Sequence, residues 1–265
     1  MELRGKSVLL TGATGGLGHA IAEVLAARGS RLVLSARRGD ELERLAESLP
    51  GEGHRAIVAD LAEDGAAARL AAEAEPVDAL VANAGLSANG RLERFSEDDL
   101  TRALRVNLEA PVQTARGVLP GMLERGAGHL VFISSLQGKV AFAHTSVYTA
   151  TKFGLRGFAL ALRDDLWGTG VGVSVVLPGF IRDAGIFAAS GRRAPMGLGT
   201  SSPEEVGEGV ATAIERNRAE LAVAPVQQRF AASVAHHGPR LASRVTRASA
   251  AGIADDVASG QADKP

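Results

Sequence analysis

Cysteine is absent from the 265-residue chain, and tyrosine and tryptophan occur once each. Without cysteine the protein forms no disulfide, binds no metal through thiolates and has no cysteine nucleophile. Aromatic residues make up only 4% of the sequence, whereas glycine is abundant, with 32 residues. This composition suits close backbone approach to a ligand better than it suits an aromatic-rich binding platform.

The chain also lacks an excess of one charge and a long apolar run. Its 29 basic and 30 acidic residues leave a formal net charge of -1, which gives no general attraction to nucleic acid or to anionic membranes. Near the N-terminus, the apolar run SVLL is far too short for a signal peptide or a membrane span. The histidines form no metal-ligand pattern with carboxylates. We therefore expect a cytoplasmic protein with no metal site and no nucleic-acid partner.

Short apolar runs alternate with segments of helical periodicity along most of the chain. The runs are continuous, as in strands that are buried on both faces, and hydrophobic residues reach 46% of the sequence. We predict an α/β fold, a single domain with a doubly wound parallel sheet of about seven strands and helices on both faces. The expected strands are 6–10, 31–35, 55–59, 78–82, 129–133, 171–176 and 220–224, and the expected helices include 17–28, 40–48, 97–121 and 146–167.

Two segments fall outside this alternation. Residues 183–203 have no strand pattern and mix small, apolar and basic residues, as functional or disordered insertions do. After Pro225, an interrupted helix leads into a polar tail. We predict a main domain over residues 1–225 and a C-terminal helical extension with a frayed tail over residues 226–265.

A glycine-rich stretch, TGATGGLG at residues 11–18, follows the first expected strand and opens directly into a helix. Gly12, Gly16 and Gly18 let the backbone turn sharply and approach a ligand closely. Free N–H groups at the helix N-terminus then favour a pyrophosphate. A plain strand-to-helix turn is the alternative, but the position after the first strand favours dinucleotide binding.

The residues after the second expected strand bear on which dinucleotide is bound. A carboxylate there would bind the ribose 2′-hydroxyl of NAD, whereas an arginine would accommodate the 2′-phosphate of NADP. The sequence places Ser35, Arg37 and Arg38 there, with no carboxylate directly after the strand. We therefore favour NADP over NAD, with solvated helix-start charges as the alternative interpretation of the two arginines.

The single tyrosine, Tyr148, lies four residues before Lys152 in an expected helix, so the two side chains share one face. A nearby ammonium group stabilises a phenolate and should lower the pKa of Tyr148 from its ordinary value near 10. Ser135 precedes the tyrosine by thirteen residues and follows an apolar strand at its carboxyl end, where ligands of open α/β sheets bind. The three residues predict an acid/base site for a carbonyl or an alcohol. Trp167 is expected to end the same helix as a packing anchor.

With these residues in place, the chain resembles the classical branch of the short-chain dehydrogenase/reductase family, whose fold is Rossmann-like. The resemblance covers roughly residues 5–225. Its motifs occur in the family order: TGATGGLG at 11–18, AD at 59–60, ANAG at 82–85, VNL at 106–108, ISS at 133–135, YTATK at 148–152 and LPG at 177–179.

The resemblance implies a role for each motif. Tyr148 would be the general acid or base, Lys152 would hold the nicotinamide ribose, and Ser135 would polarise the substrate carbonyl, with Ser134 as the rival. Asn107 would complete the catalytic set through a water-mediated proton path to Lys152. The residues implied to bind the cofactor are Gly12, Thr14, Gly16, Leu17, Gly18, Ser35, Arg37, Arg38, Asp60, Leu61, Asn83, Ala84, Gly85, Tyr148, Lys152, Pro178, Gly179 and Ile181. Taken singly, Asn107, Asp60 and Asn83 also suit cap or turn roles.

At two positions the chain departs from the family pattern, which weakens the case for the cofactor contacts implied there. After LPG the family often has a threonine that binds the nicotinamide carboxamide, whereas this chain has Asp183. Gly15 stands where many NADP-preferring relatives carry a basic residue, so NADP preference would depend mainly on Arg37 and on Arg38.

The leading hypothesis is an NADP-dependent oxidoreductase that interconverts a small-molecule carbonyl and a secondary alcohol. A non-catalytic NADP-binding regulatory protein on the same scaffold is the alternative. The resemblance implies a homo-dimer or homo-tetramer, formed through the helices that contain Asn107 and Tyr148. Residues 226–245 could instead contact a membrane, although a lid or subunit-contact helix is favoured. The expected pocket residues are Ile186, Phe187, Met196 and Leu198, with Arg192 or Arg193 available for an anionic group.

Overall fold

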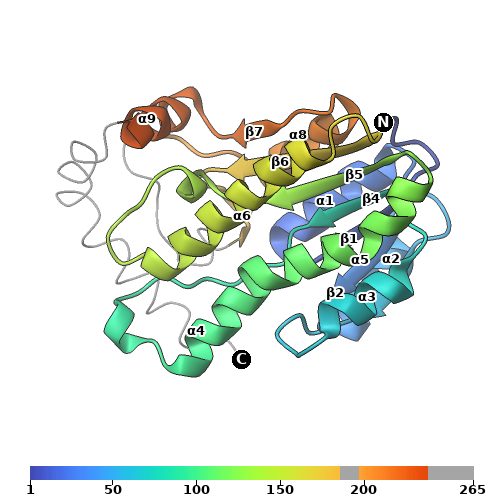
Figure 1. Cartoon of the computed structure of the whole chain (residues 1–265), viewed down its shortest axis with the longest axis horizontal. Coiled ribbons are helices and arrows are strands. Elements are labelled where there is room, and N and C mark those ends of the chain that lie inside the picture. Colours follow the sequence, from blue (N-terminus) through green and yellow to red (C-terminus); the bar gives the residue numbers. More distant parts are fainter. Residues whose placement is uncertain (186–196, 238–265) are drawn as a thin grey trace.

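The computed structural model describes residues 1–185 and 197–237, and within them seven parallel strands form one sheet (Figure 1). In spatial order the strands are β3-β2-β1-β4-β5-β6-β7. Each expected strand is present with small shifts at its ends, so the predicted fold class is confirmed. The bounds are β1 Ser7–Thr11, β2 Arg31–Ala36, β3 Arg55–Val58, β4 Ala79–Ala82, β5 Gly128–Ile133, β6 Val171–Pro178 and β7 Glu220–Val223.

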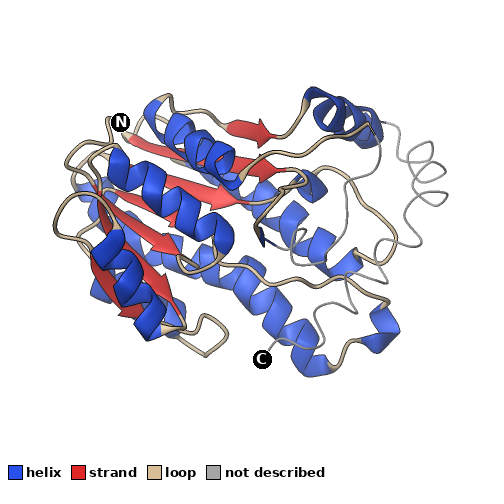
Figure 2. Ribbon diagram, turned by 180° about the vertical axis from the view of Figure 1, so that it is seen from behind, coloured by secondary structure: helices blue, strands red, loops and turns tan. Residues whose placement is uncertain are grey.

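Helices cover both faces of this sheet (Figure 2). Consecutive strand residues point to opposite faces, so Leu9 packs with α3, α5 and α6, whereas Leu10 packs with α1, α2 and α8. Both leucines are fully buried, and each such side chain contributes roughly 1.5–3 kcal/mol to folding. The helices are α1 Gly16–Ala27, α2 Gly39–Ser48, α3 Ala66–Ala74, α4 Glu97–Leu104, α5 Ala110–Glu124, α6 Ser146–Asp165, α8 Pro203–Glu215 and α9 Val226–His237.

The helix expected over residues 97–121 has a finer structure than the sequence indicated. It begins with a capping box, in which Ser96 and Asp99 each bind the other's backbone N–H. A single π-helical turn, η2 Arg105–Glu109, then separates α4 from α5. Such turns recur at functional sites because they displace a side chain from the regular helical position. Here the displaced segment contains Asn107, which is fully buried.

The order of the strands reverses direction between β1 and β4, and this switch point lies at the carboxyl edge of the sheet. Two short turns follow strands or precede helices at this edge, η1 Leu92–Arg94 and η3 Leu136–Gly138. Thr11 joins the two halves of the sheet, because its Oγ1 accepts hydrogen bonds from the N–H groups of Asn83 and Ala84, both at 3.1 Å.

Trp167 and helix α9 differ in how they pack against the core. Trp167 follows the end of α6 and is 83% exposed, so its expected role as a packing anchor is wrong. Helix α9 packs onto the core through Ala232, while Gln228 is 4% exposed. In the described part of the chain, no helix has the length and hydropathy needed to cross a bilayer. The division at residue 225 stays a prediction.

A buried histidine at the amino end of β5 makes stability depend on pH. His129 is 2% exposed, with Nε2 2.8 Å from Ser174 Oγ. Burial, and secondarily the positive charges of the N-terminus and Arg163, lowers the pKa of His129 from 6.5 to about 3. The unfolded chain therefore binds the proton first as pH falls. We expect the free energy of unfolding to decrease by roughly 2 kcal/mol between pH 6.5 and 5 from this group.

Urea unfolding of the wild type and of His129→Gln at both pH values measures this contribution. Carboxylates titrate equally in the two proteins, so the wild type should lose more stability than the variant on acidification. Equal losses would show that His129 does not cause the dependence.

Candidate active site

Tyr148, Lys152 and Ser135 meet at the carboxyl edge of the sheet, where β5 ends and α6 begins. The Nζ of Lys152 donates to the backbone oxygen of Ile133 at 3.0 Å and lies 5.6 Å from the centre of the Tyr148 ring. Ser134 Oγ donates to the backbone oxygen of Lys152 at 2.9 Å, which fixes α6 against the end of β5. Tyr148 and Lys152 are both buried, with 8% and 4% exposure.

The two neighbouring serines have different hydrogen bonds. The hydroxyl of Ser134 is engaged by the backbone of α6, as its bond to Lys152 shows. Ser135 Oγ accepts from the N–H of Gln137 at 3.1 Å and is hydrogen-bonded to the side chain of Tyr148. A serine hydroxyl has one donor and two acceptor positions, so Ser135 can accept from the Gln137 N–H and still use its proton in the hydrogen bond with Tyr148. Of the two, Ser135 has the geometry expected of a group that polarises a carbonyl.

The expected net lowering of the pKa of Tyr148 is wrong, because burial outweighs the groups that stabilise the phenolate. Burial raises the pKa of Tyr148 to about 12, and the hydrogen bond from Ser135 opposes this only in part. Burial also lowers the pKa of Lys152 to about 8. Desolvation disfavours the charged form of each group, so the phenol and the amine shift in opposite directions. At neutral pH Tyr148 is therefore a protonated phenol.

Asn107 stands beside this group through its π-helical turn. Its Oδ1 accepts from the N–H of Leu86 at 2.6 Å, and its Nδ2 donates to the Leu86 oxygen at 2.9 Å. A Cβ on Gly85 would lie 3.5 Å from Asn107 Oδ1 and 3.7 Å from Lys152 Nζ. Gly85 thus leaves the space between the asparagine and the lysine open, which supports the expected proximity of these groups.

The glycine-rich turn between β1 and α1 has the features of a phosphate cradle. Gly12 has φ of 67°, and a Cβ there would lie 2.8 Å from Ala84 Cα. A Cβ on Gly18 would lie 2.1 Å from the backbone oxygen of Gly12, so α1 starts in direct contact with the turn. Helix α1 has Gly15 as its N-cap, with no side-chain cap and no acidic residue in its first turn. Its N–H groups and dipole are therefore available to a pyrophosphate.

The two arginines after β2 differ in their surroundings. Arg38 Nη2 donates to Thr14 O at 3.2 Å and pairs with Glu41 at 2.9 Å. Arg37 is exposed and has no hydrogen-bond or ion-pair partner among residues 1–185 and 197–237. Ser35 is buried, and its backbone oxygen accepts from Ala13 N at 3.1 Å. Ser35 thus braces the glycine-rich turn, and the charge of Arg37 is available for a phosphate.

The turn after β3 holds Asp60 and Leu61, two more of the residues implied to bind the cofactor. Asp60 Oδ1 accepts from Ala62 N at 2.9 Å, and Leu61 is buried. Arg105 was not among the expected site residues, yet its Nη1 donates to Ala62 O at 2.8 Å and its Nη2 pairs with Asp64 at 2.7 Å. Arg105 therefore holds this turn from η2. Only the contact reveals it, because arginines are frequent in the chain.

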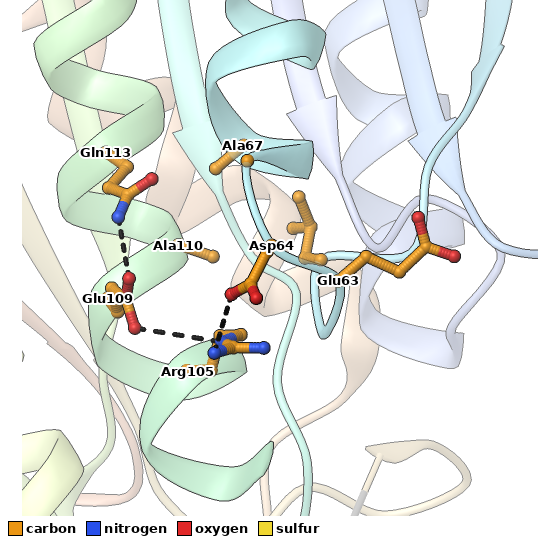
Figure 3. A pocket seen from close by; sticks show the side chains of 9 residues that line it. Glu63, Asp64, Ala67, Arg105, Glu109, Ala110 and Gln113 are labelled. Carbon is orange, nitrogen blue, oxygen red and sulfur yellow. Dashed lines mark hydrogen bonds and ion pairs between the residues drawn. The ribbon is translucent and has the colours of Figure 1, made fainter. Parts of the chain in front are cut away.

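A small hollow beside Arg105 is too small for a substrate. Figure 3 shows Arg105 between Asp64 and Glu109, and Glu109 in turn accepts from Gln113 Nε2 at 2.6 Å. The hollow has a volume of about 10 Å³, room for one water at most. The charged side chains that line the hollow pair with one another, and through these pairs they stabilise the turn after β3.

The edge next to β6 contains the expected Pro178, Gly179 and Ile181. Pro178 ends β6, Gly179 N donates to Val223 O at 3.0 Å, and Ile181 forms a bridge with Ser201. Asp183 has φ of 63° and a side chain that is 78% exposed. Leu198 is half-buried, while the other expected pocket residues lie outside the described part of the chain: Ile186, Phe187, Arg192, Arg193 and Met196.

Asn83 binds the glycine-rich turn through its side chain. Its Nδ2 donates to Thr11 O at 3.1 Å and to Gly12 O at 3.2 Å. These bonds tie the segment after β4 to the glycine-rich turn after β1. Thr11 accepts from the backbone N–H groups of Asn83 and Ala84 in the ANAG motif. It was missed as a site residue although it is the first residue of the glycine motif.

Comparison with known proteins gives a consistent result. The family model for short chain dehydrogenase matches residues 6–193. The chain is 37% identical over 227 residues to the ketoacyl reductase HetN of a Nostoc species, a match that spans 83% of this chain and 79% of the relative.

Solved structures agree with this match. The structure of a putative NAD(P)-dependent gluconate 5-dehydrogenase from Beutenbergia cavernae, with bound NADP, has a TM-score of 0.76 at 29% identity and covers 86% of this chain and 98% of its own. A short-chain dehydrogenase from Sphingobium yanoikuyae in complex with NADPH has a TM-score of 0.75 at 26% identity, with 89% and 95% covered.

Proposed function

The chain belongs to the short-chain dehydrogenase family, enzymes that interconvert CH–OH and C=O groups, and on that premise we propose an NADP(H)-dependent reductase of ketones with Tyr148 as its acid/base. The observation that carries the proposal is the grouping of Ser135, Tyr148 and Lys152 at the sheet edge beside the uncapped start of α1. A non-catalytic regulator is not favoured.

Separate residues of the chain bind the cofactor and polarise the substrate. Bound NADP(H) supplies or accepts the hydride. The first-turn N–H groups of α1 hold its pyrophosphate, and Arg37 binds the 2′-phosphate. Ser135 would turn its hydroxyl proton from Tyr148 to the substrate oxygen, which stabilises the charge that develops there.

Tyr148 delivers the proton to the same oxygen. An alkoxide is a much stronger base than a phenolate, so proton transfer from Tyr148 is favourable even with a pKa of about 12. Because the protonated phenol is the populated form at neutral pH, the free protein is prepared for reduction. We propose that Lys152 binds the nicotinamide ribose and that Asn107 supports the proton path.

The test is a turnover screen with NADPH over ketones, aldehydes and β-ketoacyl thioesters, and with NADP⁺ over secondary alcohols. β-Ketoacyl thioesters belong in the panel because one relative is named a ketoacyl reductase. We expect reduction of at least one ketone class, with NADPH preferred to NADH. Calorimetry that detected no NADPH binding at all would contradict the proposal independently of substrate choice.

The 2′-phosphate contact predicts a change of cofactor preference in Arg37→Gln. A charged hydrogen bond contributes about 1.5–3 kcal/mol, so KM for NADPH should rise roughly 10- to 100-fold while KM for NADH changes little. Arg38→Gln is the matched control, because Arg38 already binds Thr14 and Glu41 and should affect NADPH less. A larger effect in the control would assign the phosphate to Arg38.

We also propose that the enzyme is a homo-oligomer, as the resemblance implied. The outer surfaces of α4, α5 and α6 expose Leu104, Leu123 and Phe153, which are 45%, 42% and 38% accessible. Exposed apolar side chains on neighbouring helices suit a subunit interface.

A further inference from the structure

Gln228, in the third position of α9, uses both ends of its side-chain amide inside the protein. Its Oε1 accepts from Phe180 N at 3.0 Å, and its Nε2 donates to Gly199 O at 2.9 Å and to Leu198 O at 3.3 Å. The residue is 4% exposed, whereas its neighbour Gln227 is exposed. One side chain therefore links the chain leaving β6 to the chain approaching α8.

These two stretches form a stem at the sheet edge. Ser201 N donates to Phe180 O and Arg182 N donates to Ser201 O, both at 3.0 Å, around the bridge between Ile181 and Ser201. The fit of Gln228 against the stem is close, because a Cβ on Gly179 would lie 2.2 Å from Gln228 Oε1. The amide of Gln228 thus fixes the stem to α9.

Beyond the stem, the chain turns onto the phosphate cradle. Ala184 N donates to Arg182 O at 2.8 Å, which closes a tight turn at Asp183. The turn brings Ala184 against the start of α1, where a Cβ on Gly16 would lie 2.6 Å from Ala184 Cβ. Only two residues separate Arg182 of the stem from Gly185, where a Cβ would lie 3.5 Å from Leu17 Cγ. The position of the stem therefore sets how the backbone lies over the first turn of α1.

We propose that Gln228 is a positioning residue for the pyrophosphate end of the cofactor site. It touches neither cofactor nor substrate, and acts by holding the stem so that residues 182–185 lie against Gly16 and Leu17. The first turn of α9 thereby helps to hold the backbone that surrounds the cofactor site. This inference rests on the proposed function, because it needs a dinucleotide at the glycine-rich turn.

The experiment compares NADPH binding by the full-length wild type, Gln228→Met and Gln227→Met, measured by calorimetry. Methionine has a similar length but cannot replace the three hydrogen bonds of the Gln228 amide, and it removes the acceptor of the Phe180 N–H. We expect the Kd for NADPH to rise about tenfold in Gln228→Met and to stay within about twofold in the exposed control. Adenosine 2′-phosphate, which has no pyrophosphate, should bind all three proteins equally.

The outcomes separate positioning from general destabilisation and from failure of the proposed function. An unchanged Kd for NADPH in folded Gln228→Met, or an equal loss for adenosine 2′-phosphate, would overturn the role of Gln228. A wild type that binds adenosine 2′-phosphate but not NADPH, or neither, would overturn the proposed function itself. Should Gln228→Met not fold, Gln228→Asn shortens the same amide by one methylene and must give the same split between the two ligands.

Discussion

Replacing Tyr148 by phenylalanine is expected to reduce kcat by roughly a thousandfold and to leave the Kd for NADPH within about twofold. The substitution removes only the hydroxyl, so the ring keeps its packing in the buried site and Lys152 keeps its bond to Ile133 O. What is lost is the proton donor, and water cannot replace it readily where the phenol is 8% exposed. Single-turnover NADPH oxidation with the best ketone of the screen measures the effect.

The control for Tyr148→Phe is the protein's own stability and cofactor binding. Removing the hydroxyl leaves Ser135 without its tyrosine partner, so the melting temperature and the Kd for NADPH must be measured beside kcat. Turnover that survived in a folded, cofactor-binding variant would show that another group supplies the proton. Loss of NADPH binding would instead show that Tyr148 is needed to form the cofactor site.

Replacing Gly18 by alanine should destabilise the protein and remove cofactor binding together. The new Cβ would lie 2.1 Å from the Gly12 oxygen and 2.9 Å from Ala13 Cα, and a backbone cannot rotate away as a side chain can. We expect a loss of about 3 kcal/mol, with a melting temperature lowered by roughly 6–12 °C. Because the turn itself must shift, NADPH binding should weaken by about a hundredfold or more.

A matched glycine in the same protein provides the control. Gly157 lies inside α6, and a Cβ there would meet no atom within 4 Å. Gly157→Ala should therefore raise stability by about 0.5–1 kcal/mol, since alanine is the better helix former. Thermal unfolding and NADPH titration of both variants measure these changes in stability and in cofactor affinity. If Gly18→Ala behaved like Gly157→Ala, α1 would not contact the glycine-rich turn as described.

Much of this architecture could be predicted from sequence because its signals are local. The apolar run within the expected strand 129–133 is typical of a buried strand or a buried helix, and its short length and β-branched content favour the strand. The glycine-rich turn could also be predicted, because the left-handed backbone at Gly12 and the close contact of Gly18 with the Gly12 oxygen both require glycine.

What could not be predicted depends on contacts between distant segments. Arg105 and Gln228 belong to residue types that are common on protein surfaces, and their importance lies in the carbonyl groups that the fold brings to them. The direction of the Tyr148 pKa shift depends on burial, which spacing to Lys152 does not reveal. Trp167 was misjudged because apolar character alone does not fix which side of a helix end faces the core.

The π-helical turn at Arg105–Glu109 constrains how this region can change in length. A π turn holds about one residue more than the α-helical turn that it replaces. Deleting one residue here would therefore convert the wide turn to regular α-helix and leave Ala115, Val118 and Met122 facing the sheet that they now cover. The residue that would change position is Asn107, so a single-codon deletion should disturb the candidate active site far more than the packing of α5.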